Sequence, residues 1–254
     1  MSKLPEPYRF LDLSDYGRPI ARFIAASLKD TFFTPVHVTF CFMLTGLLGI
    51  LAMYHHYFLL ATLLFIFKSI LDAADGELAR IRNKPSYTGR YLDSVFDIIL
   101  NLLILLTIGY MTNSSIFLIL LAFFGLQLQG TLYNYYYVIL RNIFKGDTTS
   151  RVFETETPVA MHGENQKTVT FLYQTYLCLY GVFDRIIYAL DHSASKSCGI
   201  PSWLMTAIST FGLGFQLLII GILLTFKQIN FILPFFIAYS LLIFVFISIR
   251  KAFY

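Results

Sequence analysis

The chain has 254 residues, of which 57% are hydrophobic and only 13% are charged. A soluble domain carries about 25% charged residues, so this composition leaves too little polar surface to cover a globule in water and indicates a membrane protein. The formal net charge of +4 is too small to indicate a nucleic-acid partner, although its sign suits contact with anionic lipid headgroups.

Residues 1–35 are too polar to cross a membrane and are predicted to form a cytoplasmic N-terminal segment. Apolar side chains recur in it at helical spacing between flanking basic side chains: Ile20, Phe23, Ile24 and Leu28, with Arg18, Arg22 and Lys29. Pro19 suits the first turn of a helix. The pattern predicts an amphipathic helix that lies on the membrane surface.

Six apolar runs follow, each close to the roughly 20 residues that a helix needs to cross hydrocarbon. They cover residues 36–54, 57–74, 92–111, 116–140, 203–226 and 229–249. We therefore predict an all-α integral membrane protein with six transmembrane helices, preceded by the N-terminal amphipathic interfacial helix.

The segment 166–192 leaves the number of spans open. Four polar side chains interrupt its apolar sequence: Lys167, Gln174, Asp184 and Arg185. It is either a seventh span or a long interfacial helix. Six spans place Arg250 and Lys251 on the same side as the other basic loops, so the positive-inside rule favours the interfacial helix.

The same rule predicts the orientation. The basic loops around residues 80–90 and 141–151 are expected in the cytoplasm. Residues 36–254 then form a six-span membrane domain, in which 142–202 are a cytoplasmic loop and interfacial helix between spans four and five. We expect the bacterial cytoplasmic membrane or an equivalent membrane, with the charged stretch at residues 72–97 facing the cytoplasm.

The first half of the most informative stretch reads DAADGELAR and begins at Asp72. As a helix, it places Asp72, Asp75, Gly76 and Ala79 on one face. Glycine is unfavourable inside a helix, so Gly76 indicates that a ligand approaches the backbone closely. Arg80 follows, with a guanidinium fork suited to phosphate oxygens.

The second half places Gly89, Asp93 and Asp97 on one stripe at the start of the third span. The turn at residues 83–85 makes the two helices antiparallel neighbours, so the four aspartates are expected to converge. Such carboxylates repel one another in a low dielectric unless cations neutralise them. Oxygen ligands of this kind select Mg²⁺ or Mn²⁺.

The complete pattern, D-x-x-D-G-x-x-A-R followed by G-x-x-x-D-x-x-x-D, resembles the signature of the CDP-alcohol phosphotransferase family at every fixed position. The resemblance implies transfer of a substituted phosphate group from a CDP-linked donor to an alcohol acceptor, with release of CMP, in phospholipid synthesis. It also implies a homodimer.

The resemblance further implies a role for each motif residue. Asp72, Asp75, Asp93 and Asp97 would hold the metal, usually as two ions. Asp93 and Asp97 are the candidate catalytic residues, and Asp97 would be the general base that deprotonates the acceptor hydroxyl. The CDP group would be bound at Gly76, Ala79, Arg80 and Gly89, where the small residues leave room and the arginine lies near the diphosphate.

Several alternatives stay open at this stage. The aspartates could form structural ion pairs with Arg80, Arg82 and Arg90, and a carboxylate-site transporter or a membrane prenyltransferase also places acidic groups in a membrane. The motif does not select the donor; we favour CDP-diacylglycerol over CDP-choline, CDP-ethanolamine or CDP-inositol. Lys68, one turn before Asp72, either contacts phosphate or extends toward the membrane surface.

Overall fold

A computed structural model describes residues 4, 9–144, 156–196 and 199–253, and within this part of the chain the regular structure is entirely helical. The α-helices are α1 (Arg18–Leu28), α2 (Pro35–Tyr54), α3 (Phe58–Ile81), α4 (Tyr87–Met111), α5 (Ile116–Ile143), α6 (Gln166–Leu190), α7 (Ser202–Ile208), α8 (Leu213–Thr225), α9 (Ile232–Tyr239) and α10 (Leu242–Phe253). Four short 3-10 helices accompany them: η2 (Leu13–Asp15), η3 (His192–Lys196), η4 (Ser209–Phe211) and η5 (Ile229–Phe231). Most of the predicted basic loop at 141–151 lies outside the described residues.

Tight turns join the successive long helices. The turns after α2, α3, α4 and α8 each contain a residue with positive φ: His56, Asn83, Asn113 and Lys227. A residue in the left-handed region just past the last helical turn is a common way to end a helix. These turns confirm the boundaries that the polar breaks between the apolar runs predict.

The run at 203–226 is predicted as one helix, but the structure divides it into α7, η4 and α8, with a bend of 53°. Gly212 has extended backbone angles at the bend and lies directly against Ser14, where a Cβ atom would clash. The break thus coincides with a close contact to a residue about 200 positions away, which local sequence does not reveal.

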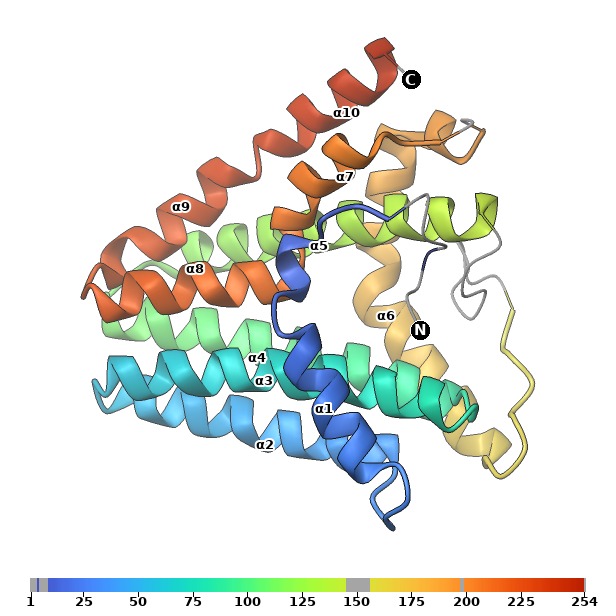
Figure 1. The fold of residues 1–254 in the computed structure, drawn as a ribbon. Helices are drawn as coiled ribbons and strands as arrows, with labels where there is room; N and C mark the ends of the chain where they lie inside the picture. Colours follow the sequence, from blue (N-terminus) through green and yellow to red (C-terminus); the bar gives the residue numbers. More distant parts are fainter. Residues whose placement is uncertain (1–3, 5–8, 145–155, 197–198, 254) are drawn as a thin grey trace.

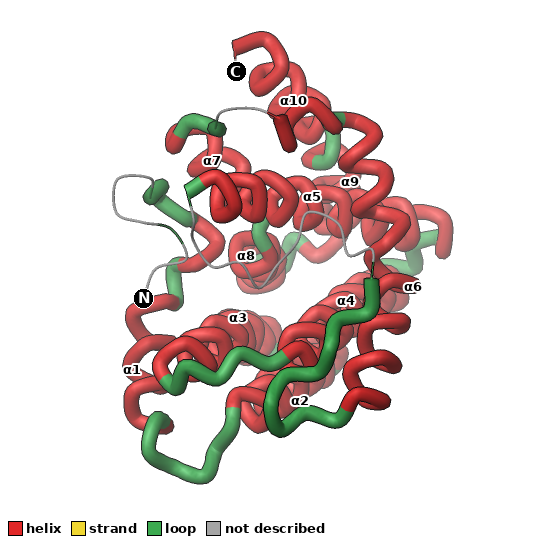
Figure 2. Tube along the Cα trace, turned by 90° about the vertical axis from the view of Figure 1, so that its right-hand side faces the viewer, coloured by secondary structure: helices red, strands yellow, loops and turns green. Residues whose placement is uncertain are grey.

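The long helices form a bundle. Figure 1 shows α2, α3, α4, α5 and α8 running side by side, whereas α1 crosses α3 and α6 runs across the bundle. In Figure 2 the bundle is viewed nearly end-on and α6 again runs across it. Both views place α6 near the end of the bundle where α3 finishes and α4 begins.

Glycines allow the helices to approach closely. A Cβ atom added to Gly46 would lie 2.6 Å from Leu100, one on Gly49 would lie 2.7 Å from Phe65, and one on Gly221 would lie 2.6 Å from Thr62. Lipid gives apolar side chains no reason to associate, so close packing of small residues is a main source of attraction between membrane helices. These glycines hold α2, α3, α4 and α8 together.

The outer surface is apolar, as lipid contact requires. Large hydrophobic side chains are exposed along α2, α3 and α5, including Leu44, Leu59, Leu63 and Phe117. Four helical segments are long and apolar enough to cross a membrane, namely α2, α4, α5 and residues 229–253, and the bent α7–α8 pair is a fifth candidate. The chain is thus an all-helical integral membrane protein. The predicted second span, α3, is not among these candidates because its C-terminal half carries the charged motif.

A buried ion pair joins the ends of α6 and α10. Arg250 donates hydrogen bonds to the carboxylate of Asp191, which is fully buried, and to Ser193 at 2.6 Å. Tyr136 on α5 also donates to Asp191, at 2.6 Å. A charge pair of this kind has to be hydrogen-bonded on both sides to be tolerated in a low dielectric, and these contacts meet that condition.

Glu164 ties the connection between α5 and α6 to the start of α4. Its carboxylate accepts hydrogen bonds from the Ser86 hydroxyl at 2.7 Å and from the backbone N–H groups of Tyr87, Thr88 and Met161. Burial raises the pKa of the Glu164 carboxyl, but these hydrogen bonds, led by that from Ser86, outweigh it and hold the pKa below its usual range. A negative charge is also favourable at a helix N-terminus.

Replacing Glu164 by Gln should lower the free energy of unfolding by about 1–2 kcal/mol at neutral pH, because charge-assisted hydrogen bonds to the α4 terminus are lost. The folded-state pKa is depressed, so this stabilisation is present above the unfolded-state pKa of about 4.3 and disappears as the pH falls through the folded-state value. In detergent, Glu164→Gln should therefore unfold at a lower temperature than wild type at neutral pH, and this difference in unfolding temperature should become smaller in acid.

The control is Glu156→Gln, at an exposed glutamate of the same connection. This variant should unfold like the wild type at both pH values. A Glu164→Gln variant that loses equal stability at neutral and acidic pH would show that the charge of Glu164 does not stabilise α4.

Candidate active site

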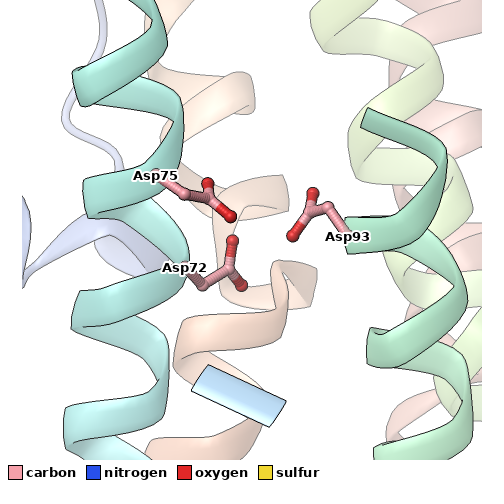
Figure 3. A group of neighbouring side chains, drawn as sticks. All are labelled: Asp72, Asp75 and Asp93. Atoms are coloured by element: carbon pink, nitrogen blue, oxygen red, sulfur yellow. The ribbon is translucent and has the colours of Figure 1, made fainter. Parts of the chain in front are cut away.

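The aspartates of the first half-motif lie on the face of α3 that points toward α4. Asp72 and Asp75 are one helical turn apart, and Figure 3 shows both carboxylates directed at Asp93 across the gap between the two helices. One oxygen atom of each of these three carboxylates lies within 4.8 Å of the others. The sequence predicts that four aspartates converge, and the structure brings three of them, separated by up to 21 positions, into one cluster.

The fourth aspartate is held by a different partner. Asp97, one turn after Asp93 on α4, forms an ion pair with Lys68, and the ammonium group of Lys68 also contacts Asp72 at 3.1 Å. Lys68 is only 2% exposed, so its ammonium group does not extend to the membrane surface. A phosphate contact remains one of the interpretations of this residue.

The cluster suits a divalent metal ion. Thr39 on α2 donates a 2.7 Å hydrogen bond to Asp75, whereas Oδ1 of Asp93 is buried and has no hydrogen-bond partner within the described part of the chain. A buried carboxylate oxygen without a donor requires a cation or another ligand to satisfy it. Three convergent carboxylates are a donor set for hard cations such as Mg²⁺ or Mn²⁺.

The arginine of the first half-motif is positioned by a glutamate that the sequence analysis did not select. Glu77, 1% exposed, contacts Arg80 at 3.2 Å and Arg18 of α1 at 2.5 Å, and Arg22 lies 3.7 Å away. Nε of Arg80 is buried without a hydrogen-bond partner among the described residues. The signal for Glu77 was present, since an acidic residue in a membrane helix next to a motif arginine indicates a pairing role.

The contacts of two arginines weaken the alternative that the four aspartates form structural ion pairs. Arg80 contacts Glu77, and Arg82 donates hydrogen bonds to backbone carbonyls at the end of α1, those of Leu28, Lys29 and Thr31. Arg82 therefore fixes the loop after α1 against α3.

The small motif residues do not serve helix packing. A Cβ atom added to Gly76 would lie 3.5 Å from the guanidinium of Arg80, and one added to Gly89 would lie 3.4 Å from Ser86, which are ordinary contact distances. Gly46, Gly49 and Gly221, in contrast, have no such room. A methyl group at Gly76 or Gly89 would therefore make ordinary contacts without a clash, and Ala79 on the same face of α3 as Gly76 is partly exposed.

α6 also contributes to the site. Tyr180 donates a 2.9 Å hydrogen bond to the backbone carbonyl of Ser94, which lies between Asp93 and Asp97 on α4. Tyr173 and Tyr176 pack with the buried Tyr91. The ambiguous segment of the sequence is thus a brace on the helix that carries two of the aspartates, a role that only its spatial position reveals.

An apolar helical bundle that gathers carboxylates from two antiparallel helices defines a membrane protein with a carboxylate centre at one end of its bundle. The profile of the CDP-alcohol phosphatidyltransferase family matches residues 32–245, and the chain belongs to this family of transferases. The match favours the phosphotransferase over the prenyltransferase and transporter interpretations.

A curated relative is the bifunctional IPC transferase and DIPP synthase of Archaeoglobus fulgidus, which is 34% identical over 109 residues. The matched region is 43% of this chain and 22% of the relative. The chain thus spans about a fifth of the length of that protein.

A substitution at Gly76 tests whether CDP binds on this face of α3. Gly76→Ala should fold and insert with normal or raised thermal stability, because alanine favours helix and the added methyl group would only make ordinary contact with Arg80, 3.5 Å away. If CDP lies on this face, the methyl group displaces it, and a shift of about an ångström costs on the order of 10²-fold in rate. CDP-dependent turnover and the stabilisation of the protein by CDP should both fall sharply.

Gly221→Ala is the matched control, since its added methyl group would lie 2.6 Å from Thr62. This variant should unfold at a lower temperature but keep its CDP-induced thermal shift. A Gly76→Ala protein that retains both turnover and the shift would exclude nucleotide binding on this face of α3.

Proposed function

We propose that the protein is a CDP-alcohol phosphotransferase of phospholipid biosynthesis. It transfers a phosphatidyl or other substituted phosphate group from a CDP-linked donor to an alcohol acceptor and releases CMP. The observation that carries this proposal is the convergence of Asp72, Asp75 and Asp93 from both halves of the family signature on one cluster.

In this proposal Asp72, Asp75, Asp93 and Asp97 form a metal-dependent centre for Mg²⁺ or Mn²⁺. A bound divalent ion would neutralise charge on the diphosphate and on the leaving CMP. The unpartnered oxygen of Asp93 and the carboxylate donor set support the assignment.

The other motif residues then bind the CDP-linked donor, and Asp97 accepts the proton of the acceptor. Gly76, Ala79 and Gly89 leave room for the CDP group, and Arg80, held by Glu77, binds diphosphate oxygens. The Asp97 carboxylate accepts the proton of the acceptor hydroxyl. The acceptor oxygen forms a bond to the phosphorus distal to cytidine, the bond from that phosphorus to the bridging oxygen breaks, and the bridging oxygen leaves with its electron pair as part of CMP.

The proposed topology has six spans: α2, α3, α4, α5, α8 with α7, and α9–α10. Although charged at its end, α3 has 24 residues, enough at 1.5 Å per residue to cross about 30 Å of hydrocarbon, and exposes leucines along its first half. Its place within the bundle supports this assignment.

The segment between α5 and α8 begins and ends at one end of the bundle, which argues against α6 as a seventh span. Tyr133 and Tyr137 of α5 contact Asp12 and Phe10, and the N–H of Leu13 donates to Ser209 just before α8. We therefore assign residues 1–35 to a cytoplasmic segment with α1 at the interface, and 36–254 to the membrane domain. Within that domain, 142–202 are a cytoplasmic loop with α6 at the interface.

The basic residues near this end of the bundle support an active site that faces the cytoplasm, in a bacterial cytoplasmic membrane or an equivalent one. The short six-span form favours CDP-diacylglycerol as the donor. We also propose a homodimer, as the family resemblance implies.

Purified protein should release CMP only when a CDP-linked donor, an alcohol acceptor and Mg²⁺ or Mn²⁺ are all present. A panel of CDP-diacylglycerol, CDP-choline, CDP-ethanolamine and CDP-inositol, each with candidate acceptors and with lipid products identified by mass, identifies the substrate pair. Exhaustive chelation should abolish release and added metal should restore it. Full activity after chelation would exclude the metal-dependent mechanism.

Asp97→Asn should reduce turnover by roughly 10²–10⁴-fold, the usual cost of removing a general base, while much of the CDP-donor affinity remains. Asp72→Asn and Asp75→Asn should instead weaken metal-dependent donor binding. Asp30→Asn, at an exposed aspartate, is the control and should retain both properties. If Asp97→Asn turns over within a few-fold of wild type, Asp97 is not the base.

A further inference from the structure

Lys68 places a buried positive charge next to the aspartate cluster. Its ammonium group is buried on α3 between Asp72 and Asp97, 3.1 Å from the first and in direct contact with the second. It also lies 4.5 Å from the ring centre of Phe42 on α2, so an aromatic face contacts the cation from a third direction. Protein atoms thus hold the ammonium group on several sides.

The group of carboxylates close enough to share one ion consists of Asp72, Asp75 and Asp93, among the described residues. Asp97 does not belong to it, although it is only one turn from Asp93. Nζ of Lys68 lies between Asp72 and Asp97 and contacts both carboxylates, so an ammonium group of the chain itself supplies positive charge at this position.

An ammonium group and a metal ion exclude each other at such a position. The lysine ammonium has three donors and no acceptor, so it cannot ligate a metal, and it repels a divalent ion placed a few ångströms away. The ammonium group supplies one positive charge to the two carboxylates, whereas a divalent ion would supply two. A two-metal centre needs carboxylates for both ions, whereas the carboxylate of Asp97 is paired with this ammonium group and Asp72 also contacts it.

We propose that the centre holds one divalent ion, bound by Asp72, Asp75 and Asp93, and that the Lys68 ammonium acts as a built-in second cation between Asp72 and Asp97. This inference rests on the metal-dependent centre of the proposed function but differs from the two ions that the family resemblance implies. Lys68 is then a positioning residue, which fixes the Asp97 carboxylate beside the metal-bound carboxylates.

The test is a titration of the purified full-length protein with Mn²⁺ in the absence of nucleotide, with free and bound ion distinguished by electron paramagnetic resonance. Wild type should bind one Mn²⁺ per chain with the spectrum of an isolated ion. Lys68→Met should bind two and show the broadened spectrum of a coupled pair, because the Asp72–Asp97 position is vacated. Lys68→Arg retains the charge and should bind one.

A second comparison does not depend on the folding of the lysine variants. Asp93→Asn removes a ligand and should lower Mn²⁺ affinity at least about tenfold, since even the loss of groups behind the ligands costs that much. Asp97→Asn should lower the Mn²⁺ affinity much less, and this variant should still bind one Mn²⁺ per chain.

Two ions in the wild type, loss of an ion in Asp97→Asn, or a single ion in a folded Lys68→Met would each overturn the role of Lys68. No Mn²⁺ bound by the wild type would instead overturn the metal centre itself, so the two failures are distinguishable.

Discussion

The mutual repulsion of carboxylates in a low-dielectric environment is the constraint on which the rest of the structure depends. Asp72, Asp75, Asp93 and Asp97 lie on two helices of an apolar bundle, and such a group is unfavourable there unless positive charge is present. The chain supplies part of that charge through Lys68, and the geometry of the other three aspartates suits a metal ion. The proposed chemistry thus uses the same carboxylate charges that make the site unfavourable without a cation.

The surrounding elements hold the two helices in place. Arg82 fixes the loop after α1 against α3, Glu164 binds the start of α4, and Tyr180 of α6 braces α4 between its two aspartates. α1 contributes as well, because Arg18 reaches Glu77, the residue that holds Arg80. The helices that lie across the bundle therefore contact both halves of the site, although neither carries a motif residue.

The helical class of the fold and the grouping of three of the four aspartates could be predicted from sequence because both depend on local patterns. Apolar runs of sufficient length predict the helices, and the spacing of the aspartates places Asp72 with Asp75 on one helical face and Asp93 with Asp97 on another. The break at Gly212, the role of Glu164 and the placement of Lys68 beside Asp97 depend on residues 29 to about 200 positions apart. No local pattern encodes such contacts, so they follow only from the packing of the bundle.

The ion pair between Asp191 and Arg250 has a consequence for biogenesis. Synthesis proceeds from the N-terminus, so Asp191 emerges 59 residues before the arginine that neutralises it, and the bundle contains an uncompensated acidic group until the last helix arrives. Docking of α10 pairs the two charges, so that this helix neutralises a buried carboxylate at the end of α6. A chain without the Arg250 guanidinium would keep the Asp191 carboxylate in the bundle without this cationic partner, which is unfavourable in a low dielectric.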